Sequence, residues 1–444
     1  MKRLLRGGRV VDPTQGLDAV ADVLIEDGRI AGVGPMRAGA GVEVVEVPAG
    51  CVVCPGFIDM HVHLREPGQE HKETIATGTA AAAAGGFTAV ACMPNTEPAN
   101  DCASLTEAIL KAAAATAHVR VYPIGAVTKG MKGEQLAEIA DLKAAGCVAV
   151  SDDGRPVPSA IIMRRALEYT LMLGLPVIDH CEEPTLKGEG TAHEGYMASV
   201  LGLRGIPAAA ESIMVERDVA LAEMTGGRVH IAHLSTRQAL RSVRAGRERG
   251  VRVTCEVTPH HFTLTDARLA DPIPYDTNLK MNPPLREAAD VDALLDGLRD
   301  GTVDAIATDH APHQPDEKFV EFDRAPFGII GLETAVPLAL DRLVRPGVIA
   351  LPRLVELMSS NPARILGVAG GSLKAGSPAD VTIIAPEAAF TVDLARSRSK
   401  SRNSPFDGWR LAGAVAATIV AGRTVYVNAE VDGAAGLGPA AARA

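Results

Sequence analysis

Two histidines separated by one residue end an apolar run in the stretch GFIDMHVHLREPG, which covers residues 56–68. Successive side chains of a strand point to opposite faces, so His61 and His63 project on one side while Val62 faces the other way. Paired imidazoles can hold a divalent cation, and Arg65 places a guanidinium two residues further on. The stretch therefore indicates metal-assisted chemistry, provided that other segments supply the remaining ligands.

Four further apolar runs end in a residue that is able to bind a metal. In chain order these residues are Asp153, His180, His233 and Asp309. Active sites of (β/α)8 barrels lie at the face where the strands have their carboxyl ends, so these side chains are expected to converge with His61 and His63. One histidine at a strand end is more often a core or rim residue than a ligand. The coincidence at five strand ends favours a site for one or two divalent ions.

Other histidines of the chain are not expected to bind a metal. His230 lies three residues before His233 and is expected to face the other way. His260 and His261 follow the seventh apolar run and are interpreted as rim residues. Three more have no candidate ligand beside them and are left unassigned: His71, His118 and His193.

Eight apolar, β-branched runs alternate with helical patterns through the middle of the chain. This alternation is typical of a parallel sheet built from βα units, and eight units predict a closed (β/α)8 TIM-type barrel over residues 54–370. The runs are VVCPGFIDMHVH, FTAVACMPN, VRVYPIGAVT, GCVAVSDD, PVIDHCE, RVHIAHLS, VRVTCEVTP and VDAIATDHAPH. The helices expected between them cover residues 104–116, 134–145, 159–174, 208–225, 236–249 and 287–299.

The two ends of the chain differ from the middle. Residues 1–53 and 371–430 hold short alternating strands with Gly and Asp turns and little helical period. We predict that they fold together as a small β-sandwich accessory domain, which gives an α/β protein of two domains. Residues 431–444 are mostly small and of low complexity, and they are expected to form a loose tail.

Composition narrows the function classes. The 444 residues are 47% hydrophobic and carry a net charge of -10. Nucleic acid and anionic membranes need a basic face, so neither is expected as the partner and a small molecule is favoured. The basic start lacks the apolar segment of a secretory signal, and Gly85 and Gly86 break the most apolar stretch, which argues against a membrane span. Seven scattered cysteines, with Cys51 and Cys54 interpreted as core thiols, fit a reducing cytoplasm.

Six motifs occur in one order between residues 59 and 333: DMHVHLREPG, MPNT, SDDG, NLKMNPPLR, ATDHAPH and APFGIIGLE. With these motifs the chain resembles the amidohydrolase superfamily and, within it, the dihydroorotases. The terminal β segments match the accessory domain of that family, so the resemblance covers nearly the whole chain. It implies a zinc-dependent cyclic amidohydrolase that reversibly interconverts N-carbamoyl-L-aspartate and (S)-dihydroorotate in de novo pyrimidine biosynthesis.

The resemblance also assigns roles to matching positions. It implies zinc ligation by all six converging side chains, with Asp309 acting in addition as the general acid and base. The substrate contacts that it implies are His63, Arg65, Asn95, Asn282, His313 and the backbone of Phe327 and Gly328. Many members of the superfamily bridge two metals with a carboxylated lysine, whereas this chain has SDDG. Asp153 is therefore the expected bridging ligand, and the number of zinc ions, one or two, stays open.

Arg65 separates the alternatives within the superfamily. A planar guanidinium pairs with a carboxylate through two parallel hydrogen bonds, and dihydroorotate carries a carboxylate beside its ring nitrogen. Hydantoins, dihydropyrimidines and allantoin lack that carboxylate, so a hydantoinase or allantoinase is the second interpretation. A third is a non-catalytic dihydroorotase-like subunit of an aspartate carbamoyltransferase complex, which the complete ligand set disfavours. The expected assemblies are a homodimer and a complex with aspartate carbamoyltransferase.

Each substrate contact also has an ordinary interpretation. Arg65 alone would be a surface residue paired with Glu66, and His313 would be a solvated rim residue. Asn95 and Asn282 would be turn formers, because each lies next to a proline.

Overall fold

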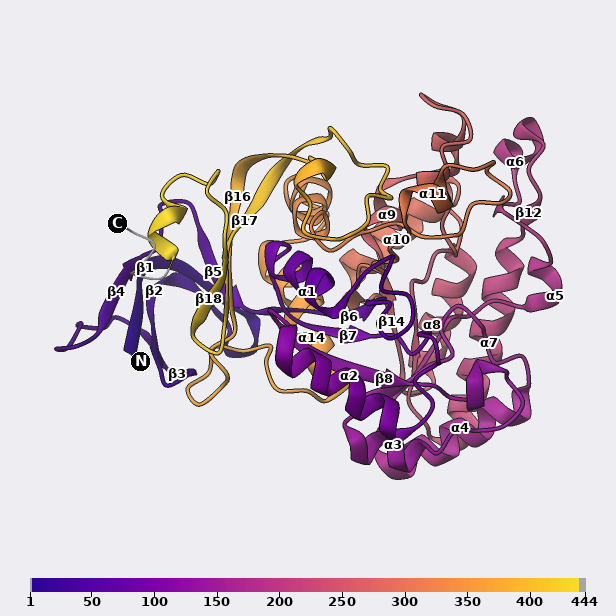
Figure 1. The fold of residues 1–444 in the computed structure, drawn as a ribbon, viewed down its shortest axis with the longest axis horizontal. Coiled ribbons are helices and arrows are strands. Elements are labelled where there is room, and N and C mark those ends of the chain that lie inside the picture. Colours follow the sequence, from indigo (N-terminus) through magenta and orange to yellow (C-terminus); the bar gives the residue numbers. More distant parts are fainter. Residues whose placement is uncertain (1, 439–444) are drawn as a thin grey trace.

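The computed structural model describes residues 2–438 and contains two sheets of eight strands each (Figure 1). One sheet forms a barrel that is surrounded by helices, and the other forms a β layer beside it, at the left of the view. A short additional sheet pairs β11 (Ala192–His193) with β12 (Gly205–Ile206). Within residues 2–438, none of the helices combines the length and the apolar character needed to cross a membrane.

The eight predicted barrel strands pair in parallel in the order β15-β14-β13-β10-β9-β8-β7-β6. Their bounds are β6 (Phe57–Val62), β7 (Phe87–Cys92), β8 (Arg120–Gly125), β9 (Ala149–Val150), β10 (Val177–Asp179), β13 (Val229–Ile231), β14 (Val253–Val257) and β15 (Ala305–Ile306). The amide of His63 donates to the carbonyl of His310 at 2.9 Å, which joins β6 to the segment after β15. This contact nearly closes the ring, and the (β/α)8 prediction is confirmed.

The helices between these strands begin and end close to the predicted residues, with one exception. They are α2 (Ala103–Thr116), α4 (Ala160–Leu173), α7 (Ala208–Thr225), α8 (Arg237–Glu248) and α10 (Ala288–Asp300), and α1 (Ile75–Ala84), for which no bounds were predicted, lies between β6 and β7. The helix predicted over 134–145 is wrong in its first half, because α3 spans only Ile139–Ala145. Leu136 instead forms a bridge with Thr128, and the Ala137 amide donates to Val127, so this segment pairs with the loop after β8.

Short helices complete the chain between the main elements. Before β15 these are α5 (Pro184–Lys187), α6 (Tyr196–Leu201) and α9 (Pro259–Thr263). After β15 they are α11 (Pro315–Lys318), α12 (Ala335–Ala339), α13 (Leu351–Val355) and α14 (Asn361–Leu366).

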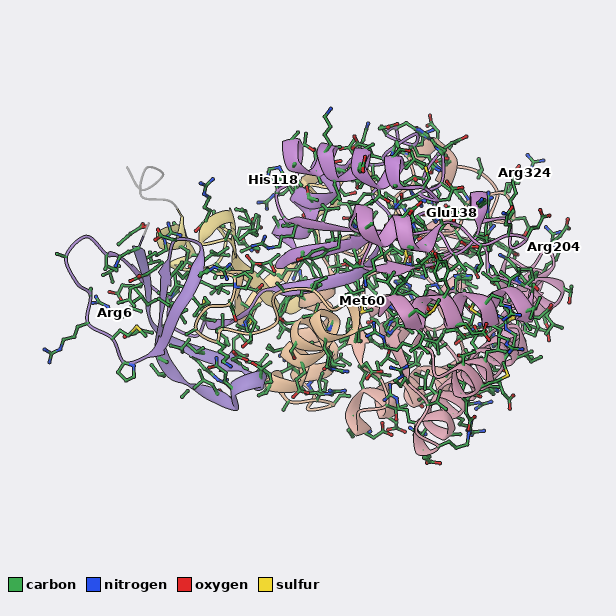
Figure 2. All side chains as sticks on the ribbon, turned by 90° about the horizontal axis from the view of Figure 1, so that it is seen from below. Arg6, Met60, His118, Glu138, Arg204 and Arg324 are labelled. Carbon is green, nitrogen blue, oxygen red and sulfur yellow. The ribbon has the colours of Figure 1, made fainter. Side chains whose placement is uncertain are left out.

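Side-chain alternation along the strands decides what fills the barrel. Ile58 and Met60 of β6 belong to an inner cluster with small residues of the other strands, and α14 packs against this cluster. In Figure 2, Met60 lies within the molecule, whereas Arg204 and Arg324 lie at its edge. The alternate residues of the strands belong to a second cluster that includes the surrounding helices. Both faces of the strands are therefore buried, which explains their nearly continuous apolar sequences.

The β layer combines the two ends of the chain in one hydrogen-bonded sheet. Its strands are β1 (Lys2–Asp12), β2 (Leu17–Glu26), β3 (Arg29–Gly34), β4 (Glu43–Glu46), β5 (Val52–Pro55), β16 (Val381–Thr391), β17 (Arg410–Val420) and β18 (Arg423–Val427). Strand β5 joins the two ends, because it pairs in parallel with β1 and antiparallel with β16. Cys51 and Cys54 are buried free thiols, as expected.

Two segments of the C-terminal part differ from the expectation. Residues 392–409, between β16 and β17, leave the sheet and pack against the barrel, where Asn403 bonds to loops beside the histidines. The tail expected from residue 431 is packed over residues 431–438, because Val431, Ala434 and Leu437 are buried in the core of the β layer. The rest of that expected tail, 439–444, lies outside the described residues.

Candidate active site

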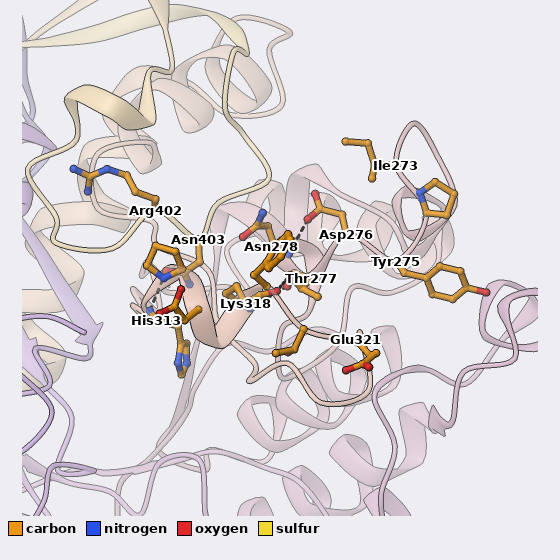
Figure 3. A pocket seen from close by; sticks show the side chains of 15 residues that line it. Ile273, Tyr275, Asp276, Thr277, Asn278, His313, Lys318, Glu321, Arg402 and Asn403 are labelled. Carbon is orange, nitrogen blue, oxygen red and sulfur yellow. Dashed lines mark hydrogen bonds between the residues drawn. The ribbon is translucent and has the colours of Figure 1, made fainter. Parts of the chain in front are cut away.

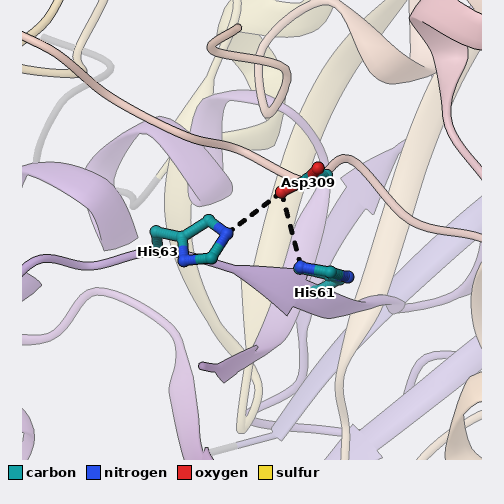
Figure 4. Close-up of side chains that lie close together, drawn as sticks. All are labelled: His61, His63 and Asp309. Carbon is teal, nitrogen blue, oxygen red and sulfur yellow. Dashed lines mark hydrogen bonds and ion pairs between the residues drawn. The ribbon is translucent and has the colours of Figure 1, made fainter. Parts of the chain in front are cut away.

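The structure brings all six predicted ligand side chains together at the carboxyl ends of the strands. The Nε2 atom of His63 lies 3.0 Å from Oδ1 of Asp309, and Nε2 of His61 lies 3.4 Å from the same oxygen (Figure 4). On the other side, Nδ1 of His180 lies 2.8 Å from Nε2 of His233. All six side chains are buried.

Asp153 lies in the middle of this group and faces all four histidines. Its Oδ1 atom is 3.3 Å from His61, 3.6 Å from His233 and 3.7 Å from His180. Its Oδ2 atom is 3.5 Å from His63. One carboxylate thus connects the pair of histidines on β6 with the pair that follows β10 and β13.

The donor set fits a divalent cation. His61 Nε2 and Asp153 Oδ1 are buried and form no hydrogen bond, although only 3.3 Å separates them, so neither atom is satisfied by its neighbour. Ligand atoms about 2.1 Å from a tetrahedral zinc are about 3.4 Å apart, which is close to the separations around Asp153. Nitrogen and carboxylate oxygen ligands are those that zinc prefers, and the buried, unsatisfied atoms are the ones that a cation would engage.

Strained backbone holds two of these residues. His233 has a φ of 32° and Asp309 a φ of 47°, in the left-handed region that residues with a side chain rarely adopt. Such conformations cost about 1–3 kcal/mol and persist where the surroundings fix them. Before Asp309, the amide of Thr308 donates to the buried Asp59 at 3.1 Å. The fold therefore sets the direction of this carboxylate at an energetic cost.

Asp309 is ionised in this setting. Burial acts to raise the pKa of its carboxyl group, but His61, His63 and His233 outweigh that effect and hold the pKa well below its usual range. A carboxylate that stays deprotonated, beside two histidines and facing a cavity, can accept a proton from a bound molecule.

Arg65 lies in the wall of the same cavity, which has a volume of about 500 Å³. Its Nε atom donates to the carbonyl of Pro312 at 3.2 Å, and Nη2 is 3.4 Å from Nε2 of His313. Among the described residues no carboxylate lies within ion-pair distance of Arg65, and Glu66 accepts instead from the amide of Ile75. Burial lowers the pKa of the guanidinium to about 10, so the charge persists at neutral pH.

The two predicted asparagines contact histidines that are predicted ligands. Oδ1 of Asn95 lies 2.8 Å from Nδ1 of His63, and Nδ2 of Asn282 lies 3.2 Å from Nε2 of His180. The amide oxygen of Asn282 is buried without a hydrogen bond, and the residue lines the cavity. Both positions are thus more than turn formers.

The segment after β15 also lines the cavity. Phe327 lines the cavity, and its carbonyl lies 2.9 Å from Nε2 of His313. Gly328 follows with a φ of 152°, and a Cβ atom there would lie 2.6 Å from the carbonyl oxygen of Ala311. Only glycine fits this close approach, which holds the backbone of the segment against the loop after β15.

Sequence profiles of known families match most of the chain. A profile described as Dihydro-orotase-like matches residues 50–239, and one described as Amidohydrolase family matches residues 204–426. A dihydroorotase of Geobacter metallireducens is 54% identical over 96% of this chain and 100% of its own length. One of Geotalea daltonii is 56% identical over 96% and 99%. The chain belongs to the dihydroorotase family.

Solved structures of related enzymes share the fold. An L-hydantoinase (dihydropyrimidinase) from Arthrobacter aurescens has a TM-score of 0.86 at 25% identity, with 95% of both chains covered. A dihydropyrimidinase from Brevibacillus agri has a TM-score of 0.85 at 24% identity, with 99% of this chain and 98% of the other covered. These identities are less than half of those to the dihydroorotases, so the family assignment follows the sequence relatives and the architecture agrees with both groups.

The sequence-based predictions of this dihydroorotase family member did not include Glu256, a buried carboxylate beneath the histidines. Oε1 of Glu256 on β14 lies 2.9 Å from Nδ1 of His61, and Oε2 lies 3.2 Å from Nε2 of His230. A lone carboxylate inside the apolar run VRVTCEVTP was the available signal, because such a charge is rarely buried without a partner. His230 is not one of the six converging side chains, but it lies beneath them, where it contacts Glu256.

The interpretation of His260 and His261 as rim residues is wrong. Both lie in α9 and are buried, and Nε2 of His261 lies 2.9 Å from the carbonyl of Pro283. Burial lowers the pKa of His260 to about 3, so this side chain is neutral at ordinary pH.

A larger hollow of about 920 Å³ lies at the far side of the segment that carries His313 (Figure 3). Ile273, Tyr275 and Phe319 around it are exposed, and Asn403 lies at its opposite end. Of the residues discussed above, it shares only His313 with the cavity at Arg65. The chemically equipped cavity is therefore the smaller of the two.

Proposed function

We propose that this chain is a dihydroorotase that binds zinc at the six converging side chains and interconverts (S)-dihydroorotate and N-carbamoyl-L-aspartate. The observation that carries the proposal is Arg65, a buried cation that has no carboxylate partner among residues 2–438 and lies in the cavity where the six side chains meet. Hydantoin and allantoin have no carboxylate for this group, whereas dihydroorotate does. The relatives at 54% and 56% identity support the same substrate.

The six side chains would hold one or two zinc ions, and Asp153 would be the shared ligand if two bind. Asp153 faces the His61 and His63 pair with one oxygen each, and its Oδ1 also faces His180 and His233. When bound, the metal lowers the pKa of a water molecule and polarises a carbonyl oxygen. The residues of the chain supply orientation and proton transfer.

Asp309 moves the proton in both directions. In ring opening, the attacking water adds to the ring amide carbonyl and its proton goes to the Asp309 carboxylate, which is ionised in this site. As the bond between the carbonyl carbon and the ring nitrogen breaks, Asp309 returns that proton to the nitrogen. In ring closure the same carboxylate takes the proton from the carbamoyl nitrogen and gives it to the departing oxygen.

The remaining predicted contacts orient the substrate. Arg65 binds the carboxylate through two parallel hydrogen bonds, with Asn95 and His313 beside it at the cavity wall. Asn282 and the backbone of Phe327 and Gly328 hold the ring. Oriented binding matters because the carbonyl must lie within reach of both the metal and Asp309.

The cellular setting follows from the activity and from the resemblance. We place the chain in de novo pyrimidine biosynthesis in the cytoplasm, as a homodimer that can associate with aspartate carbamoyltransferase. Sedimentation of the purified chain, alone and with aspartate carbamoyltransferase, tests this assembly.

One comparative assay tests the activity. Purified chain with measured zinc content is offered dihydroorotate, hydantoin and allantoin, and ring opening is followed by ultraviolet absorbance. We expect turnover of dihydroorotate and at least a hundredfold lower kcat/KM for the uncharged rings. Preference for an uncharged ring would make the chain a hydantoinase or allantoinase. No turnover alone or with aspartate carbamoyltransferase would indicate the non-catalytic subunit.

A further inference from the structure

One sector of the barrel interior is polar, although the rest is filled by alanine and aliphatic side chains. Residues Val253, Cys255 and Val257 of β14 belong to the outer cluster, so the alternate positions Thr254 and Glu256 face inward. His230 on β13 is paired in register with Thr254 and faces the same way. These side chains lie directly beneath His61.

The polar residues form one continuous chain of hydrogen bonds. Oγ1 of Thr254 lies 2.8 Å from Nδ1 of His230, and Nε2 of His230 lies 3.2 Å from Oε2 of Glu256. The other oxygen of Glu256 lies 2.9 Å from Nδ1 of His61. Glu256, His230 and His61 are fully buried, so water does not compete for these contacts.

The contact with Glu256 determines which nitrogen of His61 can bind a cation. A carboxylate only accepts hydrogen bonds, so Nδ1 of His61 must carry the hydrogen. Nε2 then keeps its lone pair, and it is this atom that faces Asp153 at 3.3 Å and Asp309 at 3.4 Å. A carboxylate behind a histidine ligand fixes the tautomer and the ring orientation and increases the basicity of the ligating nitrogen.

The other ligand histidines have weaker support among the described residues. His63 is backed by the neutral amide of Asn95, and Nδ1 of His233 has no hydrogen-bond partner. Glu182 lies 3.5 Å from His180, but its charge is shared with the ammonium of Lys187 at 2.9 Å. His61 is therefore the ligand with the shortest contact to a carboxylate that no lysine or arginine neutralises.

We propose that Glu256 is a positioning residue that sets the affinity of the metal position at His61, and that His230 and Thr254 act through it by fixing its second oxygen. This makes the position at His61 and His63 the tighter one if two cations bind. The proposal depends on metal binding by the six side chains but not on the identity of the substrate, so metal measurements test it separately from the activity.

The first test uses Glu256→Gln, which keeps the size of the side chain and removes its charge. Zinc affinity is measured by competition with a chelating dye, and the cobalt-substituted protein is examined by visible absorption. We expect zinc binding to weaken by about 10- to 100-fold and the cobalt bands to shift, because the amide lacks the negative charge that makes the ligating nitrogen of His61 more basic. Zinc affinity within twofold of the parent with an unchanged cobalt spectrum would overturn the proposal.

A matched control separates positioning from general stability. Glu73 is also fully buried and forms a similar contact with His310 at 3.2 Å, but His310 is not among the six ligands. Glu73→Gln is therefore expected to lower the melting temperature of the metal-free protein while zinc affinity stays within about threefold. Equal losses of zinc affinity in both variants would show that Glu256 acts only through stability, and would also overturn the proposal.

A substitution at Thr254, the last residue of this series of hydrogen bonds, is expected to have a smaller effect. Thr254→Val removes only the hydroxyl that holds His230 and leaves the shape nearly unchanged. We expect zinc binding two- to fivefold weaker than in the parent, without a change in the melting temperature of the metal-free protein. If Glu256→Gln does not fold, Thr254→Val becomes the test of the proposal. Unchanged zinc affinity in Thr254→Val would then count against it.

Discussion

At the scale of the residue, the proposal gives Asp309 two roles, metal binding and proton transfer. Its Oδ1 atom faces both His61 and His63, which leaves Oδ2 for a proton. The neighbouring histidines oppose the effect of burial and keep the pKa of the group low, so the proton that it accepts is given up readily. A side chain of the same shape that cannot accept a proton separates the two roles.

The variant Asp309→Asn is expected to lower kcat by at least a hundredfold while the zinc content stays largely intact. The amide keeps an oxygen for the metal but cannot take the proton of the attacking water, and general acid–base catalysis contributes about 10²- to 10⁴-fold. Ring opening by ultraviolet absorbance and elemental analysis of the same sample provide the measurements. The exposed Asp316→Asn is the control, and near-parental turnover in Asp309→Asn would refute the role.

The variant Arg65→Met is expected to raise KM for dihydroorotate by about 10- to 100-fold, because a hydrogen bond to a charged group contributes about 1.5–3 kcal/mol. The equilibrium between the two substrates does not depend on the enzyme, so kcat/KM must fall by the same factor in both directions. Steady-state kinetics with each substrate checks both points. Arg155→Met, at an exposed position of the same cavity, is expected to stay within about threefold. An unchanged KM in Arg65→Met would mean that another group binds the carboxylate.

The six converging residues could be predicted at this scale because each follows an apolar run with the pattern of a strand. Their meeting depends only on the rule that parallel barrel strands end at one face. Glu256 and Asn403 could not be found in this way. Glu256 lies inside an apolar run rather than at its end. Its role in the site depends on its contact with the ring of His61, which is 195 positions away along the chain. Asn403 acts through loop carbonyls, for which the sequence has no local pattern.

At the scale of the element, two buried lysines hold the segment after β15 against the segment before Asn282. Nζ of Lys318 donates to the carbonyls of Thr277 and Pro326 at 3.0 and 2.8 Å. Nζ of Lys280 donates to the carbonyls of Phe322 and Asp323 at 2.7 and 3.0 Å. The wall that carries Phe327 is thus fixed by contacts across two loops. The first half of the helix predicted over 134–145 failed because Leu136 and Ala137 pair locally with the loop after β8 instead.

Lys318 makes the stability of this wall depend on pH. Burial and the nearby Lys280 lower the pKa of Lys318 from 10.5 to about 7, so between pH 7 and 10.5 the unfolded chain binds the proton that the folded chain has released. Stability from this group therefore rises with pH across that window. In Lys318→Met the slope of unfolding free energy against pH near 8.5 should fall by up to about 1.4 kcal/mol per pH unit. Urea unfolding at pH 7.5, 8.5 and 9.5 measures it, with the exposed Lys132→Met as control, and an unchanged slope would contradict the argument.

At the scale of the whole molecule, the β layer holds the two ends of the chain together beside the barrel. Thr424 belongs to β18, and its hydroxyl accepts from Arg3 at 2.8 Å and donates to the carbonyl of Leu437 at 2.9 Å. Short alternating strands at both ends made a shared domain predictable. The packing of residues 431–438 was not, because small residues dominate there and only the spacing of Val431, Ala434 and Leu437 by three marks a buried side.

Removal of residues 431–444 is therefore expected to destabilise the β layer, although composition alone suggested a dispensable tail. Val431 and Leu437 are 6% and 1% exposed, and burial of such side chains contributes about 1.5–3 kcal/mol each, so the loss should be about 3–6 kcal/mol. A truncation that removes only residues 439–444 serves as the control, because it keeps all three buried side chains. Thermal and urea unfolding of both truncations against the full chain measure the difference. The longer truncation should lose stability while the shorter one stays close to the parent. Equal stability of the two would mean that Val431, Ala434 and Leu437 contribute nothing to the core that joins the two ends of the chain.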